Sequence, residues 1–127
     1  MPGRSRDWLK QAAHDLEQAR ASQRDGRHDW ACFAAHQAAE NAAKAMHLAL
    51  GQDASRHAVA TLLAQLPQRA PAALIDKARV LDDVATRHAN GPPAGARFED
   101  YGVLQSQQAI DYAGEILEYA RTEVGFS

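Results

Sequence analysis

The sequence predicts an all-α fold: an antiparallel up-and-down bundle of four long helices plus one short helix. Three observations lead to this. Apolar residues recur at i, i+3 and i+4 over long stretches. Alanine dominates a chain that is 46% hydrophobic but has only three Phe, three Tyr and two Trp, which favours closely packed helices over strands. Short connections favour antiparallel neighbours. With 127 residues, we expect one domain spanning residues 1–127.

The first two helices are predicted over residues 5–23 and 29–50. Ser5 is a candidate N-cap of the first helix, which ends in the turn at Gly26. Its apolar stripe consists of Trp8, Leu9, Ala12, Ala13, Leu16 and Ala19. The second helix ends at Gly51, a residue type suited to the position after a helix. Its alanines lie on several faces, so we expect it at the centre of the bundle. Its larger apolar residues are Trp30, Phe33, Met46, Leu48 and Leu50.

Three further helices follow. A short helix is predicted over residues 56–65, with Ser55 as a candidate N-cap, and the next over residues 71–87, with Pro71 in its first turn. Residues 88–100 contain so much Gly and Pro that we expect no regular structure there, and a connection this long is typical of a functional loop. The last helix is predicted over residues 103–124. Its stripe is Val103, Ile110, Ala113, Ile116 or Leu117, Ala120 and Val124.

Composition excludes several classes of protein. The net charge of −2 provides no general attraction to nucleic acid, so an RNA contact would need a local basic patch. Cys32 is the single cysteine, which rules out an intrachain disulfide and indicates a reducing compartment. The start of the chain does not resemble a secretory signal, and no apolar run approaches the roughly 18 residues of a membrane span. We therefore expect a cytoplasmic protein.

One polar stripe on the second helix has the chemistry of a metal site. His, Cys and Glu side chains are zinc ligands, and here they recur every four residues. The stripe contains His28, Cys32, His36, Glu40 and Lys44. However, its ends drift about 120° apart around the helix, so one metal ion could use only two or three of them. We expect a partly buried polar stripe with a Glu40–Lys44 ion pair, and no metal or cofactor.

A second group of polar residues surrounds the end of the fourth helix. Arg79, Asp83 and Arg87 are spaced to form a charged ladder, and we expect Asp82 and Asp83 to be solvated. A guanidinium at the helix end can bind phosphate and a histidine can transfer protons, although cations there also complement the helix dipole. The candidate phosphate-binding residues are Arg79, Arg87, His88, Asn90 and Arg97, with Tyr101 nearby.

Four segments in order resemble the HEPN domain family. Residues 7–16 resemble its first helix. Residues 30–45, WACFAAHQAAENAAKA, resemble its A-x-F-x-x-Q-A-A-E-K-A-x-K-A signature. The segment around His57 resembles its short H-x-x-x-x-L-L helix. Residues 81–98 resemble its L-D-x-x-Y-x-x-T-R-Y-P-N-x-x-P-G-G-x-P-Y segment, with His88 and Ala89 in place of the Tyr-Pro pair. The matching polar signature residues are Gln37, Glu40, Lys44, His57 and Asp82.

The resemblance implies a homodimer that binds a nucleotide or RNA, often paired with a minimal nucleotidyltransferase as toxin and antitoxin. It also predicts a two-fold interface of alanine-rich helices. Some members are metal-independent ribonucleases with an R-x(4–6)-H motif, but no arginine here has a histidine at that spacing. Two alternatives remain open. One is a toxin ribonuclease in which Arg87 positions phosphate and His88 acts as acid or base, and the other is a purely structural helical dimer.

Overall fold

Helices make up nearly all of the structure. The computed structural model describes residues 2–52, 58–90 and 97–125, with the backbone alone for residues 2, 3 and 88–90. The elements are α1 (Pro2–Arg24), α2 (His28–Ala49), α3 (Val59–Ala64), α4 (Ala72–Asn90), the short 3-10 helix η1 (Phe98–Asp100) and α5 (Val103–Val124). The described residues contain no strand, so the predicted all-α class is confirmed.

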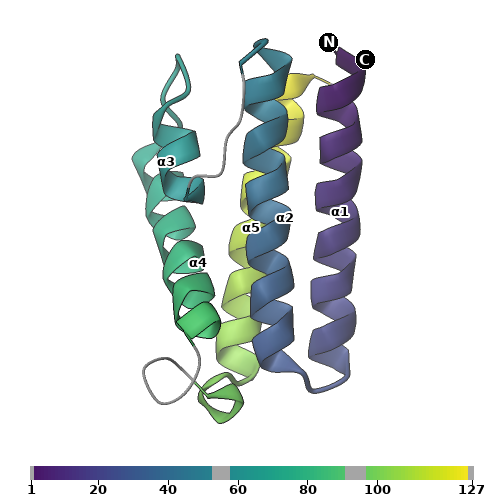
Figure 1. Cartoon of the computed structure of the whole chain (residues 1–127), viewed down its shortest axis with the longest axis vertical. Coiled ribbons are helices and arrows are strands. Elements are labelled where there is room, and N and C mark those ends of the chain that lie inside the picture. Colours follow the sequence, from purple (N-terminus) through teal and green to yellow (C-terminus); the bar gives the residue numbers. More distant parts are fainter. Residues whose placement is uncertain (1, 53–57, 91–96, 126–127) are drawn as a thin grey trace.

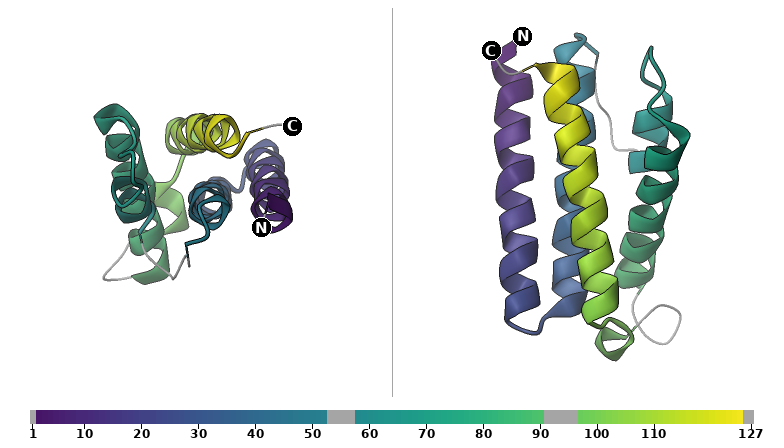
Figure 2. Two further views of the ribbon diagram at one scale, coloured as in Figure 1. Left: turned by 90° about the horizontal axis from the view of Figure 1, so that it is seen from above. Right: turned by 180° about the vertical axis from the view of Figure 1, so that it is seen from behind.

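Two of the four long helices lie in the middle of the bundle (Figure 1). Helix α2 contacts α1, α3, α4, α5 and η1, and α5 contacts α1, α2 and α4. Helices α1 and α4 flank this central pair, and their described residues make no contact with each other. The view along the helices in Figure 2 shows the same arrangement. Consecutive long helices run in opposite directions, so the predicted up-and-down topology is confirmed.

The predicted end of α2 is confirmed in detail. Gly51 has a positive φ of 72°, which is the left-handed conformation that glycine adopts without strain. Its amide donates to Leu48 O over 3.0 Å, and the Gln52 amide donates to His47 O over 2.9 Å. These two bonds form a Schellman motif, which satisfies carbonyl groups that the last turn of a helix otherwise leaves without partners.

Other predicted helix ends were wrong. Helix α1 begins at Pro2, a residue type that suits the first turn of a helix, so Ser5 lies inside the helix and is buried instead of capping it. Helix α3 is described only over Val59–Ala64, and the predicted cap and first residues at 55–57 lie outside the described residues. The fourth helix continues to Asn90, so the segment from 88 to 100 is partly helical and also contains η1.

The core follows the predicted apolar stripes of α1 and α5. Leu9 and Leu16 on α1 and Ile116 and Leu117 on α5 are buried. Three larger apolar residues were assigned wrongly, because Trp30, Leu50 and Val103 are 53%, 55% and 60% exposed. Each lies in the first turn or at the end of its helix. Neighbouring helices cover the helix surface most fully in the middle of the bundle, so side chains near the ends are more exposed.

The alanine-rich face of α2 explains why this helix occupies the centre. Its alanines bring the backbones of α1, α4 and α5 close to that of α2, because a methyl group separates two helices less than a leucine does. The buried alanines are Ala31, Ala35, Ala38, Ala39, Ala42, Ala43 and Ala45, each at most 1% exposed. Within the described part of the chain, no helix has the length and apolar character required to cross a membrane.

Candidate functional site

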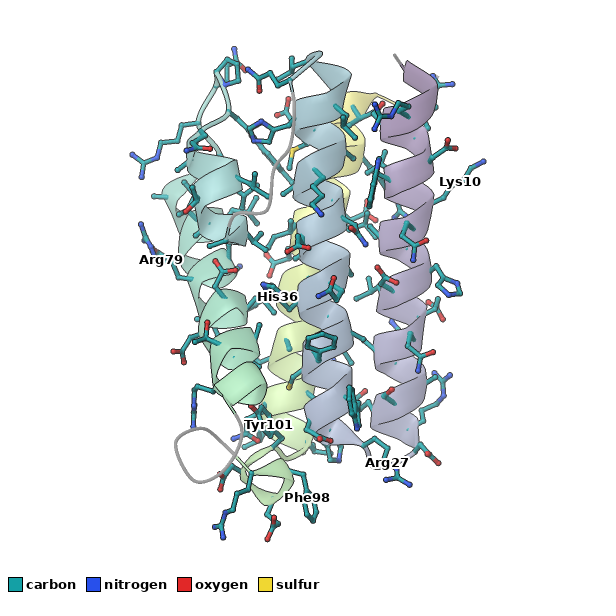
Figure 3. All side chains as sticks on the ribbon, viewed as in Figure 1. Lys10, Arg27, His36, Arg79, Phe98 and Tyr101 are labelled. Carbon is teal, nitrogen blue, oxygen red and sulfur yellow. The ribbon has the colours of Figure 1, made fainter. Side chains whose placement is uncertain are left out.

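The predicted working end of the protein lies where α4, η1 and α5 meet (Figure 3). Tyr101 directly follows η1, is 9% exposed, and donates its hydroxyl proton to Val84 O of α4 over 3.5 Å. Burial raises the pKa of this hydroxyl, and the nearby positive charge of Arg87 opposes the rise. Tyr101 therefore fixes the start of α5 against α4 and leaves Arg87 beside it, exposed to solvent.

Arg97 and η1 lie next to this contact. The Arg97 amide donates to Asp100 Oδ2 over 2.8 Å, and the Asp100 amide donates back to Arg97 O over 2.9 Å. These bonds hold η1 in one conformation, with Phe98 70% exposed at the end of the bundle. His88 and Asn90, the other predicted phosphate ligands there, belong to the last turn of α4, and their side chains lie outside the described residues.

Arg79 is separate from this cluster. It lies two helical turns before Arg87, and Figure 3 shows it far from Tyr101 and Phe98. Its guanidinium pairs with Asp76 at i−3 over 2.7 Å. The predicted ladder through Asp83 was therefore wrong at its first step. An arginine can pair with a carboxylate at i−3 as readily as with one at i+4. The sequence spacing alone therefore does not predict which of the two ion pairs forms.

His36 of α2 and Asp82 of α4 form a polar contact between these two helices. The Nε2 of His36, which points toward α4 in Figure 3, donates to Asp82 Oδ1 over 3.0 Å. The same carboxylate accepts hydrogen bonds from the backbone amides of Val59 at 2.9 Å and Ala60 at 3.0 Å. Asp82 therefore caps the N-terminus of α3 from another helix, and the prediction that it is solvated was wrong. Its partners are at least 22 residues away in the sequence, so no local pattern indicates them.

This pair makes stability depend on pH. Burial alone would raise the pKa of Asp82, but the hydrogen bonds from His36, Ala60 and Val59 outweigh it and lower the pKa below its ordinary value of 3.8. A carboxyl group whose pKa is lower in the folded state stabilises the fold above its unfolded pKa, and this contribution disappears as pH falls through the folded pKa.

We therefore expect Asp82→Asn to flatten the acid limb of the stability curve. Urea unfolding of both proteins between about pH 6 and pH 3 checks this, because the wild type should lose more free energy of unfolding over that range than the variant. If the free energy of unfolding falls equally with pH in the two proteins, Asp82 does not contribute to the pH dependence of stability.

The polar residues of the stripe on α2 contact different partners. His28 Nδ1 lies 2.9 Å from the hydroxyl oxygen of Ser106 on α5, and His36 binds Asp82. The predicted Glu40–Lys44 ion pair is confirmed at 3.5 Å. No group of three metal-ligating side chains occurs among the described residues. The two histidines of the stripe thus link α2 to α5 and α4, whereas Glu40 and Lys44 pair within α2.

Cys32 lies within the same stripe. It is fully buried, and burial together with the negative charge of Asp29 raises the pKa of its thiol to about 11. A thiol with this pKa remains protonated at neutral pH, whereas a nucleophile or a zinc ligand must be a thiolate. Its surroundings are those of a small core residue.

Of the remaining signature residues, Lys44 has a contact with a neighbouring helix. Lys44 lies 5.3 Å from the centre of the Trp8 ring, a cation–π contact that joins α2 to α1. Gln37 is half-buried on α2, and His57 lies outside the described residues. Sequence reasoning missed Ser106, which is fully buried and accepts a hydrogen bond from Gln23 of α1 over 3.1 Å.

Three solved structures resemble this chain over nearly its whole length. TT1696 from Thermus thermophilus is 42% identical with a TM-score of 0.87, and the match covers 94% of this chain and 98% of that one. ST0689, an archaeal HEPN homologue, is 30% identical with a TM-score of 0.82, covering 95% and 98%. An HEPN domain protein from Thermotoga maritima is 30% identical with a TM-score of 0.75, covering 91% and 95%.

The family assignment agrees with these structures. Among curated proteins, none matches the chain. The family model described as HEPN domain matches residues 5–123, a span from the first turns of α1 to the last turn of α5. The chain therefore belongs to the HEPN domain family.

Proposed function

We propose that this protein is a non-catalytic HEPN module that binds a nucleotide or an RNA phosphate at the junction of α4, η1 and α5. The observation that carries the proposal is the exposed guanidinium of Arg87 beside the buried Tyr101, with Arg97 at the start of η1. An exposed arginine at such a junction can bind a phosphate through two parallel hydrogen bonds. The absence of the R-x(4–6)-H spacing from the sequence supports binding rather than cleavage.

The charges at this end favour a ligand with few phosphates. Arg87 and Arg97 are accompanied by Asp29, Glu99 and Asp100, which are acidic residues on α2 and η1. Affinity for a long RNA depends on many clustered cations that replace its counterions. One or two phosphates need only the bidentate contacts of one or two arginines, so a nucleotide or a short RNA end fits this surface better.

Nucleotide binding is tested by thermal unfolding with ATP, GTP or a short single-stranded RNA. A ligand that binds the native state should stabilise it by about 2.7 kcal/mol at a hundredfold excess over its dissociation constant. We expect Arg87→Ala to weaken binding at least about tenfold, since a charged hydrogen bond contributes roughly 1.5–3 kcal/mol. Arg79→Ala is the matched control, because it removes an exposed arginine from the same helix two turns away.

The control separates a site from a general charge effect. If both variants weaken binding equally, attraction by net charge explains the result and the site is wrong. If none of the three ligands shifts the melting temperature of the wild type, the proposal of nucleotide binding fails.

We further propose that the protein acts as a homodimer and pairs with a nucleotidyltransferase in a toxin–antitoxin system. The support for this part is family membership and the resemblance of residues 30–45 and 81–98 to the family's signature segments. A nucleotidyltransferase reading frame next to this gene, whose product co-purifies with the chain, is the expected finding. A gene distant from any nucleotidyltransferase, together with no complex between purified proteins, would contradict it.

A further inference from the structure

A pocket lies at the end of the bundle opposite η1, between the last turns of α2 and α5 and the connection from α3 to α4 (Figure 1). Its volume is about 240 Å³. Helix α4 begins only at Ala72, so the third wall of the pocket is the non-helical segment 66–68. Such a segment lacks the ridges of side chains with which a packed helix fills the space beside two others. The pocket follows from this change of wall.

The walls of the pocket are mostly apolar. Met46 and Leu66 are 2% and 8% exposed and form its inner part, whereas Leu50 is 55% exposed and lies where the pocket opens to solvent. Pro67 completes the apolar lining on the side of the connection.

The volume limits the size of a ligand. An apolar protein cavity of about 150 Å³ accepts one benzene ring, so this pocket has room for a ring and a short chain. It is smaller than the roughly 300 Å³ at which pockets for drug-sized ligands begin.

One carboxylate gives the pocket its charge. Among the described residues that line it, Glu123 is the single charged one. Its carboxylate accepts a hydrogen bond from the hydroxyl of Tyr119, one turn earlier on α5. Burial and this hydrogen bond raise the pKa of Tyr119, so the hydroxyl remains a donor at neutral pH. A carboxylate has about four lone-pair positions, so Glu123 can accept further hydrogen bonds from a ligand.

A negative charge beside apolar walls selects the charge of the ligand. It attracts a cation and repels an anion, and an ammonium group can also donate charge-assisted hydrogen bonds to it. A nucleotide carries negative charge, so this pocket differs in specificity from the surface around Arg87 at the other end of the bundle.

We propose that the pocket binds a small organic amine, with its ammonium group at Glu123 and an apolar body about the size of one aromatic ring against Met46 and Leu66. This inference goes beyond the proposed nucleotide site and does not depend on it.

An NMR titration of the isotope-labelled full chain with phenethylamine hydrochloride tests the proposal. We expect saturable shift changes concentrated at the backbone amides of pocket residues such as Met46 and Tyr119. Hydrocinnamate has nearly the same size and shape but is an anion, so it should bind at least about tenfold more weakly. Phenethyl alcohol is the neutral probe of the apolar walls and should bind with intermediate affinity.

Two variants of α5 separate the pocket from a general charge effect. Glu123→Gln should weaken phenethylamine binding at least about tenfold and leave the binding of phenethyl alcohol unchanged, which shows that the pocket is intact. Glu118→Gln is the matched control, because it removes an exposed carboxylate that pairs with Arg121 and does not line the pocket. It should leave both affinities unchanged.

Several results would overturn the inference. The amine might give no saturable shifts, or shifts centred away from the pocket. Equal affinities for phenethylamine and hydrocinnamate, or equal effects of Glu123→Gln and Glu118→Gln, would show that Glu123 does not select the ligand. Arg87→Ala should not alter amine binding, so a failure of the nucleotide site would leave this inference standing, and the reverse also holds.

Discussion

Replacing Asp82 with alanine is expected to lower the free energy of unfolding by about 3 kcal/mol, because three groups lose their common acceptor. The side chain of Asp82 is 17% exposed and accepts hydrogen bonds from His36, Val59 and Ala60. Loss of an N-cap alone costs roughly 0.5–2 kcal/mol, and the largely buried histidine adds a polar group without a partner. Urea unfolding monitored by circular dichroism measures the difference.

Asp83→Ala is the control for this prediction. Asp83 is the next residue on α4 and is exposed, so its removal should change the free energy of unfolding by less than about 0.5 kcal/mol. The sequence predicted that both aspartates are solvated, and in that case the two variants would behave alike. Equal, small effects would therefore show that Asp82 does not link α2, α3 and α4.

Replacing Ala39 with leucine is expected to destabilise the protein by roughly 3 kcal/mol and to lower its melting temperature by about 10 °C. Ala39 is fully buried in α2, where this helix contacts the other long helices. A leucine adds three carbon atoms to an interior without room for them, so neighbouring helices must move apart or the side chain must leave its preferred rotamer. Differential scanning calorimetry measures both quantities.

Ala49→Leu separates this packing effect from helix propensity. Ala49 is the last residue of α2 and is exposed, and leucine is almost as good a helix former as alanine. We therefore expect a change below about 0.5 kcal/mol. If Ala39→Leu is tolerated as well as Ala49→Leu, α2 does not occupy a closely packed centre.

The sequence alone predicts the helices well, because helix formation depends on residues three or four positions apart. It predicted α5 over residues 103–124, the end of α2 at Gly51, and the buried stripe of α1. Its errors lie at helix ends, as with Ser5, where one or two hydrogen bonds decide the boundary.

The candidate site was predicted only in part. The sequence placed Arg87 and Tyr101 near one another, because both lie beside the same connection between two helices. It did not show that Arg79 lies apart from them. An ion pair of Arg79 with Asp76 and a charged ladder through Asp83 both have a spacing of about one helical turn, so the sequence does not distinguish them. It also gave no indication that Phe98 and Leu104 would remain exposed at this end.

Periodicity, alanine content and turn residues determined an all-α bundle with α2 at its centre, because these depend on neighbours along the chain. The tertiary structure alone decided which polar residue becomes an interhelical link and which apolar residue remains at the surface. Asp82 became a cap because α3 begins beside it at Val59, 23 residues away in the sequence. Trp30 stayed exposed because the neighbouring helices cover only one side of the first turn of α2, where Ala31 is fully buried. A repeat along one helix defines its faces, and only the packing of the other helices determines what each face meets.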